Sequence, residues 1–213
     1  MVGRFKMEEL FVSLHCFKLC LNDGEISRKE LTERINELAK KTANEGMFIS
    51  RQYFSIKRNV DLILFNIAGS FDILLSFKQN LIELFGNVLN ETYSYLSIYE
   101  HPNVSYMKED SRLKYFVAYP VKKDPKWYLL EEKEQNRITK EHVNLAVSDS
   151  NNENIRSYTT YSFAIDDHEF LVMYEVESLV KWMKVARDLR KAEARNWIIV
   201  ESPVFVGKKV ENV

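Results

Sequence analysis

Apolar residues recur along the chain in two patterns, one typical of strands and the other of amphipathic helices. Residues 10–20 and 60–69 are almost continuously apolar, whereas residues 27–45 space their apolar side chains three or four positions apart. The predicted elements of the first half are a strand at 10–20, a helix at 27–45, strands at 47–56 and 60–69, a helix at 70–85 and a strand at 91–100. The predicted order is therefore β-α-β-β-α-β.

The same order is predicted again after a polar loop at residues 101–112. The second set is a strand at 114–120, a helix at 131–147, strands at 155–164 and 168–176, a helix at 178–194 and a strand at 196–206. The two halves align with an offset of roughly 105 residues, which indicates an internal repeat. We therefore expect an α+β fold in which two ferredoxin-like repeats, residues 1–105 and 106–213, form a dimeric α/β barrel within one chain.

Composition is that of an ordinary water-exposed domain and excludes several functional classes. Of the 213 residues, 46% are hydrophobic and 29% charged, with a net charge of -1, which gives no support for nucleic acid or an anionic membrane as a partner. The apolar runs are shorter than the 18 or so residues that a membrane-spanning helix needs. The first residues carry acids where the apolar core of a secretory signal would begin, so a cytoplasmic protein is expected.

Sequence motifs of other enzyme and metal classes are missing. Cys16 and Cys20 are the only cysteines, lie on one predicted strand and are expected to be reduced, packed thiols. No CxxC pair suggests zinc, and there is no glycine-rich phosphate loop, GxSxG elbow or HExxH motif. Asp166 and Asp167 are typical of a turn.

The segment from Tyr119 to His142, YPVKKDPKWYLLEEKEQNRITKEH, concentrates the candidate chemistry. It joins an oxidisable tyrosine at a strand end to two lysines, an aromatic WYLL block and a histidine on a charged helix. A phenol, cations that hold carboxylates and an imidazole that binds iron are the parts that a haem enzyme needs. This segment therefore suggests a haem site.

Each of these residues also has a purely structural interpretation. His142 follows Ile138 by four residues and precedes Leu145 by three, so it shares an apolar helix face, where a packed histidine is common. Trp127 and Tyr128 are more typical of a staple that seats the next helix than of a cofactor wall. Residue types and spacing alone leave both interpretations open.

Several motifs taken together resemble the chlorite dismutase-like haem proteins, and more closely their coproheme decarboxylase branch. They are the opening FVSLHCFKL, then ETYSYLSIYE, YPVKKDPKWYLL with its KEH ending, YTTYSFAIDDHEF, LRKAEAR and the final SPVFVGKK. The resemblance covers nearly the whole chain, and its more specific motifs lie in the second half.

The resemblance implies a haem b or coproheme group in the C-terminal half. It implies His142 as the iron ligand, Tyr119 as a radical-forming tyrosine that attacks a propionate, and Lys123 as the lysine that places that propionate. Glu193 falls near an acidic position that hydrogen-bonds the iron-binding imidazole. Hydrogen peroxide as oxidant and a homo-oligomer, often a pentamer, are also implied.

The chain departs from the family pattern at Ser157, where chlorite dismutases carry arginine and many decarboxylases glutamine. Arg156 is adjacent, but successive strand residues face opposite ways, so it should not reach the same pocket. His101, in the loop between the halves, is the only histidine that could handle peroxide in place of the missing arginine or glutamine. Efficient chlorite breakdown is therefore not expected.

We expect a haem-dependent oxidoreductase that converts coproheme to haem b with hydrogen peroxide, with Tyr119, Lys123, His142 and Ser157 at the site. One alternative is a peroxidase-like or haem-carrying member of the same family. The other is a ferredoxin-like binding protein without haem.

Overall fold

The computed structural model describes residues 9–20 and 26–210. The expectation about an N-terminal signal rests mainly on residues 1–8, which lie outside the described residues. No helix in the described ranges has the length and apolar character needed to cross a membrane.

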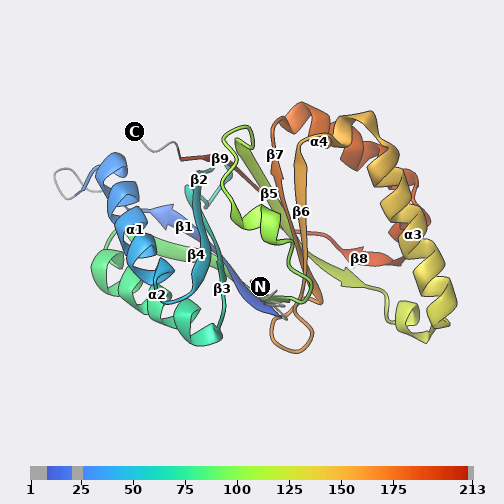
Figure 1. Ribbon diagram of the computed structural model, residues 1–213, viewed down its shortest axis with the longest axis horizontal. Coiled ribbons are helices and arrows are strands. Elements are labelled where there is room, and N and C mark those ends of the chain that lie inside the picture. The colour runs from blue at the N-terminus through green and yellow to red at the C-terminus, as the bar shows by residue number, and fades with distance from the viewer. Residues whose placement is uncertain (1–8, 21–25, 211–213) are drawn as a thin grey trace, which may run out of the picture.

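Within the described residues, nine strands form one antiparallel sheet that closes on itself (Figure 1). They are β1 (Leu10–Leu19), β2 (Met47–Phe54), β3 (Leu62–Ala68), β4 (Leu89–Tyr99), β5 (Tyr115–Lys123), β6 (Ile155–Tyr161), β7 (Phe170–Val176), β8 (Ile198–Val200) and β9 (Phe205–Lys209). Their order is β7-β6-β4-β1-β3-β2-β9-β5-β8, and β7 also pairs with β5. This second pairing closes eight strands into a ring and leaves β8 outside it.

In the part of the chain that the structure describes, four α-helices cover the ring, with α1 and α2 on one side and α3 and α4 on the opposite side (Figure 1). They are α1 (Arg28–Ala43), α2 (Phe71–Phe85), α3 (Glu132–Ser148) and α4 (Leu179–Asp188). Short 3-10 helices are η1 (Val104–Met107), η2 (Pro125–Leu129), η3 (Ser150–Asn152), η4 (Leu189–Lys191) and η5 (Glu193–Trp197). Ser27, Ser70 and Ser178 cap α1, α2 and α4 by accepting a backbone N–H, which explains where these helices begin.

Apolar side chains fill the inside of the ring and the space beneath the first two helices. The inner cluster takes alternate residues of the strands, among them Leu14, Phe65, Phe116, Tyr158 and Phe205. The second cluster joins the outer face of β3 to α1 and α2 through Leu31, Ile35, Leu74, Phe77 and Leu81. Full burial of each such side chain is worth about 1.5–3 kcal/mol relative to exposure.

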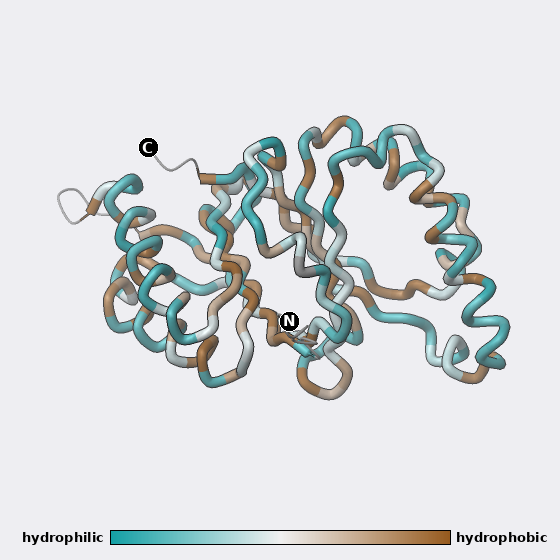
Figure 2. The backbone as a smooth tube through the Cα atoms, in the orientation of Figure 1, coloured by the Kyte–Doolittle hydropathy of each residue, from teal (hydrophilic) through white to brown (hydrophobic). Residues whose placement is uncertain are grey.

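The helices of the second half bury far less. Ile138 is the buried residue of α3 and Val185 that of α4. In Figure 2, α3 is predominantly hydrophilic. The sheet beneath α3 is therefore not sealed by an apolar layer like the one beneath α1 and α2.

The predicted element order agrees with the structure, with differences at the ends. Strand β5 continues past Pro120 to Lys123, because Pro120 falls between the stretch paired with β9 and the stretch paired with β8, where its missing N–H costs little. The helix predicted to reach residue 194 ends at Asp188, and the last predicted strand is divided into β8 and β9. Tyr119 is therefore inside a strand and not at its end.

Both cysteines are free thiols, as predicted. Cys16 is buried in the inner cluster, but Cys20 follows the end of β1 and is exposed. The prediction that both are packed is wrong for Cys20, since the alternation of strand residues that buries Cys16 stops at Leu19.

A buried ion pair crosses the inside of the ring. Arg51 on β2 donates to the carboxylate of Glu175 on β7, with only 7% and 1% of the two side chains exposed. The same carboxylate accepts hydrogen bonds from Tyr53 at 2.7 Å and Tyr158 at 2.6 Å. A buried charge is costly unless it is paired and hydrogen-bonded, so Arg51, Glu175 and the two tyrosines depend on one another. Together they link β2, β6 and β7.

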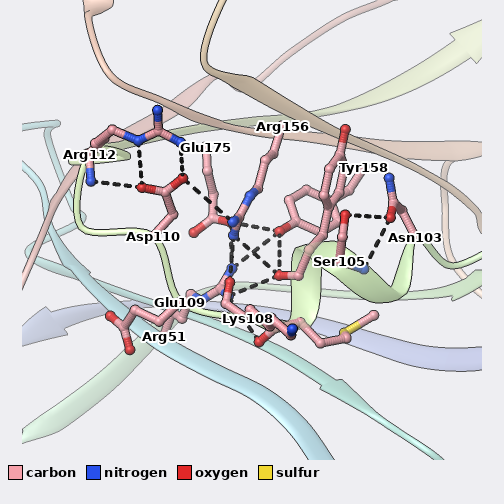
Figure 3. Close-up of polar contacts among 12 residues, drawn as sticks. Arg51, Asn103, Ser105, Lys108, Glu109, Asp110, Arg112, Arg156, Tyr158 and Glu175 are labelled. Atoms are coloured by element: carbon pink, nitrogen blue, oxygen red, sulfur yellow. Dashed lines mark hydrogen bonds and ion pairs between the residues drawn. The ribbon is translucent and has the colours of Figure 1, made fainter.

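The connection between the two halves closes over this pair (Figure 3). Arg51 donates to the backbone carbonyls of Tyr106 and Lys108 at 3.0 and 3.2 Å, and Arg156 donates to that of Lys108 at 2.7 Å. The guanidinium groups thus satisfy carbonyl groups of η1 and the residue after it, which would otherwise lack partners.

Replacing Glu175 with leucine should lower the free energy of unfolding by about 3–5 kcal/mol, because Arg51 would remain buried and unpaired. Urea titration followed by circular dichroism measures this. The control is Asp188→Ala, which breaks an exposed pair with Lys191 and should cost less than about 1 kcal/mol. Equal losses in the two variants would contradict the assigned role.

Candidate functional site

A cavity of ≈160 Å³ lies between α3 and the outer face of β5 and β7. Its remaining walls come from η2, η5, β8 and Glu201. Tyr119, Lys123 and His142 all line it, so the fold brings together three residues that the sequence singled out. Strand alternation explains two of them, because Tyr119, Val121 and Lys123 occupy every second position of β5 and face the same way.

Tyr119 is half-buried beside a second phenol, that of Tyr174 on β7. Their ring centroids are 6.1 Å apart. Burial raises the pKa of the Tyr119 phenol, so it stays protonated across the physiological range. A neutral phenol at the cavity wall is an oxidisable group that still carries its proton.

Lys123 has an unusual partner for an ammonium group. Its Nζ lies 3.4 Å from the centroid of the Trp127 ring and 5.5 Å from that of Phe170. Burial lowers the pKa of Lys123 to about 8, while the charge of Glu169 opposes the shift. A cation held by aromatic faces in a partly dry cavity is well placed to take a carboxylate, which would be a stronger partner.

The packing role expected of Trp127 does not exclude a place in the cavity wall. Trp127 is buried and lines the cavity, so it is a wall of the pocket as well as packing material, with its ring 5.8 Å from that of Trp197. Tyr128 points away, is 42% exposed and donates to Glu169 at 2.6 Å. The 3-10 turn of η2 sends the two neighbouring rings in different directions.

His142 faces the cavity from α3, one turn after the buried Ile138. Its Nδ1 is buried and has no hydrogen-bond partner, and burial lowers the pKa of the imidazole. The expected apolar face is only partly present, since Leu145 is 42% exposed. A neutral imidazole with a free nitrogen is the form that binds metals.

The predicted contact between Glu193 and His142 is not formed. The Glu193 carboxylate accepts hydrogen bonds from Arg137 at 2.8 and 2.9 Å instead. The reason is local, because Arg137 reaches from α3 to the start of η5 and offers a full positive charge that the neutral imidazole cannot match.

The three residues considered for the other side of the pocket do not enter it directly. Ser157 is exposed on the outer face of β6 and does not line the cavity, although its cross-strand partner Tyr174 does. Arg156 points into the ring, toward Lys108 and Glu175, as strand alternation predicted. His101 is exposed in the loop after β4 and does not line the cavity.

Three further residues of the cavity were not anticipated from the sequence. Arg195 and Glu201 line it and form a two-pronged ion pair with contacts of 2.6 and 2.8 Å. Tyr174 lines it from β7. The alternation of strand residues would have placed Tyr174 on the same face of β7 as Val172. Arg195 and Glu201 reach the cavity only through the pairing of β8 with β5, which no local pattern signals.

Among the described residues, no group of three or more histidine, cysteine, aspartate or glutamate side chains could hold a metal ion. What the cavity offers is one imidazole, one ammonium, a pair of phenols and aromatic walls. This set can bind a flat aromatic ligand with carboxylate groups and a metal that takes a single protein ligand.

Comparison with known proteins gives the same family from sequence and from structure. The chlorite dismutase family model matches residues 28–210. The coproheme decarboxylase of Mycolicibacterium smegmatis is 30% identical over 96 residues, which cover 45% of this chain and 40% of that protein. This alignment therefore spans less than half of that relative.

Solved structures match over almost the whole chain. One named as a putative chlorite dismutase is 31% identical, with a TM-score of 0.83 and 95% of both chains covered. A mutant chlorite dismutase from Candidatus Nitrospira defluvii has a TM-score of 0.81 at 15% identity, covering 95% of this chain and 92% of the other. A haem-binding protein from Thermus thermophilus has a TM-score of 0.78 at 21% identity, covering 96% and 92%. The last two show likeness of fold, whereas the family model matches most of the sequence, and the chain therefore belongs to the chlorite dismutase family.

Proposed function

We propose that this protein binds iron coproporphyrin, or coproheme, and decarboxylates it with hydrogen peroxide to give haem b. The observation that carries the proposal is the meeting of Tyr119, Lys123 and His142 in one cavity. Membership of the chlorite dismutase family and the partial likeness to a coproheme decarboxylase support it.

The residues present fit an iron porphyrin. The orphaned Nδ1 of His142 leaves the imidazole without a competing partner, and its lowered pKa keeps it neutral and able to bind iron. The volume of ≈160 Å³ is below the roughly 300–1,000 Å³ of ligand pockets, so binding requires α3 to move outward. Because Ile138 is the one buried residue of this helix, such a movement would uncover little apolar surface.

The ligand's carboxylates have a partner in Lys123. Its ammonium is already partly desolvated and rests on aromatic faces, so a propionate would add a charge-assisted hydrogen bond. Arg195 is less available, because Glu201 occupies its guanidinium. Lys123 would therefore fix which propionate lies beside the phenol.

Tyr119 would perform the bond-breaking step. The bound iron would supply the oxidising chemistry with peroxide. The phenol would give up an electron and its proton to the oxidant, and the resulting radical would take a hydrogen atom from the neighbouring propionate, which restores the phenol. The substrate radical would then lose a second electron to the same oxidant, the bond to its carboxylate would break to release carbon dioxide, and the double bond of a vinyl group would form. Phenylalanine at this position could not do so, since it has no O–H to oxidise.

A second candidate is a haem-binding, peroxidase-like or carrier protein of the same family. The exposure of the short Ser157, which does not line the cavity, favours it, because no long polar side chain from that position would meet peroxide. Binding of coproheme without loss of its carboxyl groups would support this candidate and contradict the decarboxylase proposal.

We also infer that residues 1–105 and 106–213 are two ferredoxin-like repeats and that the protein is a homo-oligomer, with a pentamer as the family pattern suggests. The matching β-α-β-β-α-β order of both halves supports the first inference. Light scattering coupled to size-exclusion chromatography tests the second.

Tyr119→Phe should stop decarboxylation and leave binding of coproheme within about twofold, because the phenol hydroxyl is needed for the radical and not for packing. Mass spectrometry of the porphyrin after addition of peroxide counts the carboxyl groups lost. Tyr115→Phe on the same strand is the control and should keep wild-type activity. An active Tyr119→Phe variant would remove this residue from the mechanism.

His142→Ala should abolish the protein-ligated Soret spectrum of added ferric haem, because the imidazole nitrogen is the proposed iron ligand. Absorption spectroscopy measures it, with His101→Ala as the control from an exposed loop. A wild-type spectrum in the His142→Ala protein would show that another residue ligates the iron.

Affinity for metal-free coproporphyrin should be highest below pH 8 and fall as the pH rises above it. The pKa of Lys123 is lowered to about 8, so its ammonium is charged below that value and neutral above it. The fall should approach about tenfold per pH unit until the pKa of the complex is reached.

Fluorescence titration of the porphyrin between about pH 6 and 10 measures this dependence. Lys123→Met should weaken binding at neutral pH by roughly tenfold or more and flatten the profile. Lys122→Met, whose side chain leaves the opposite face of β5, should keep the wild-type profile. A pH-independent wild-type affinity would exclude Lys123 as the carboxylate partner.

A further inference from the structure

Lys123 and Glu169 carry opposite charges and touch through the main chain, yet among the described residues no hydrogen bond or ion pair joins their two side chains. One oxygen of the Glu169 carboxylate, Oε2, accepts the main-chain N–H of Lys123 at 2.8 Å. The ammonium of the same lysine lies instead 3.4 Å from the ring centroid of Trp127 and 5.5 Å from that of Phe170. A charge-assisted hydrogen bond is normally stronger than a contact with an aromatic face, so the surroundings must hold the carboxylate away from the ammonium.

Tyr128 binds the same carboxylate oxygen. Its phenol donates to Oε2 of Glu169 at 2.6 Å, so this oxygen accepts two hydrogen bonds that together fix the direction of the carboxylate. The Tyr128 ring lies 5.9 Å from that of Phe163, which lies 5.2 Å from that of Phe170, measured between centroids. The phenol is thus seated on the aromatic cluster that also borders Lys123, and the carboxylate is directed at the main chain and at Tyr128.

The sheet fixes where Glu169 lies. Its N–H donates to the carbonyl of Val121 at 3.1 Å, and its carbonyl accepts from the N–H of Ser162 at 2.8 Å. The pairing of β5 with β7 ends at Val121 and Phe170, so the N–H of Lys123 lies beyond the last residue pair and takes a side-chain acceptor. The carboxylate is therefore anchored beside the lysine whose ammonium it does not bind.

Neither Tyr128 nor Glu169 lines the cavity, whereas Lys123 does. Any effect of these two residues on a ligand would therefore pass through Lys123. The same cavity shows what an internal carboxylate does to a cation, because Glu201 holds the guanidinium of Arg195 through two contacts. An ammonium paired in that way would have to leave its partner before it could bind a carboxylate of the ligand.

We propose that Tyr128 is a positioning residue that holds the Glu169 carboxylate away from the Lys123 ammonium and so keeps that ammonium free for a carboxylate of the ligand. This proposal rests on the proposed function, since it takes Lys123 as the partner of a propionate. The contacts that carry it belong to the ligand-free protein, and they do not depend on decarboxylation.

The test is proton NMR of ligand-free protein labelled with carbon-13 lysine, with the Lys123 signal assigned from Lys123→Met. In the wild type, the Trp127 ring face should move the ε-methylene protons of Lys123 upfield. Tyr128→Phe removes one oxygen and keeps the ring beside Phe163. It should return the Lys123 signal downfield, because the released Glu169 carboxylate would draw the ammonium off the indole.

A second substitution should reverse this effect. Tyr128→Phe combined with Glu169→Gln should restore the upfield signal, because a neutral amide still accepts the main-chain N–H of Lys123 but binds an ammonium weakly. Glu169→Gln alone should leave the signal in place. Tyr161→Phe is the matched control, since its ring lies 5.6 Å from that of Phe170 and the change again removes one phenol oxygen. It should also leave the signal in place.

Binding gives the second measurement. Tyr128→Phe should raise the Kd of metal-free coproporphyrin about three- to tenfold at neutral pH, the value of one hydrogen bond. The double variant should return the Kd to within about twofold of the wild type. A merely structural loss at Tyr128 would not be repaired by a substitution on a different segment.

Two results would overturn the proposal: an unmoved Lys123 signal in Tyr128→Phe, or a double variant that keeps the signal and the Kd of Tyr128→Phe. Wild-type protein that binds coproheme without decarboxylating it would overturn the proposed decarboxylation alone, because the NMR and the metal-free binding results would stand.

Discussion

The ion pair between Arg51 and Glu175 is the interaction on which the rest of the structure depends. It places two charges inside a ring of apolar side chains, where each would be strongly unfavourable alone. Tyr53 and Tyr158 complete the shell of the carboxylate, and backbone carbonyls of the inter-half connection complete that of the guanidinium. β2 and β7 come from different halves of the chain. The need to pair both buried charges therefore links the closure of the ring to the path of the connection between the halves. The strands that carry the cavity residues are positioned by the same closure.

The helices cover the two outer faces of the ring in different ways. The proposed ligand site lies on the face that α3 covers. Beneath α1 and α2, leucine, isoleucine and phenylalanine side chains fill the space. Beneath α3, the corresponding layer is replaced by Tyr119, Lys123, His142 and Trp127 around a cavity. Polar and aromatic groups at this surface stabilise the fold less than a packed apolar layer would, but they can hold a ligand. The weakly buried α3 is the element that a bulky ligand would displace.

The candidate site illustrates how far local patterns reach. Tyr119 and Lys123 share a strand face through an even spacing, and His142 follows a buried residue by one helical turn, so their orientation was predictable from the chain. The expected link from Glu193 to His142 failed, because Arg137 competes for that carboxylate. Its failure depends on where α3 meets η5, a contact between segments far apart in the chain that no spacing rule describes.

The sequence by itself determined the element order, the inward and outward faces of the strands, and the residues with chemistry suited to a haem ligand. These features depend on periodicities of about 2 and 3.6 residues and on side-chain chemistry, both of which are local. Only the tertiary structure decided that Lys123 rests on Trp127, that Arg195 is held by Glu201, and that the rings of Tyr119 and Tyr174 lie side by side. Each of these contacts links segments whose relative geometry is fixed by strand register and ring closure, which depend on the packing of the whole chain.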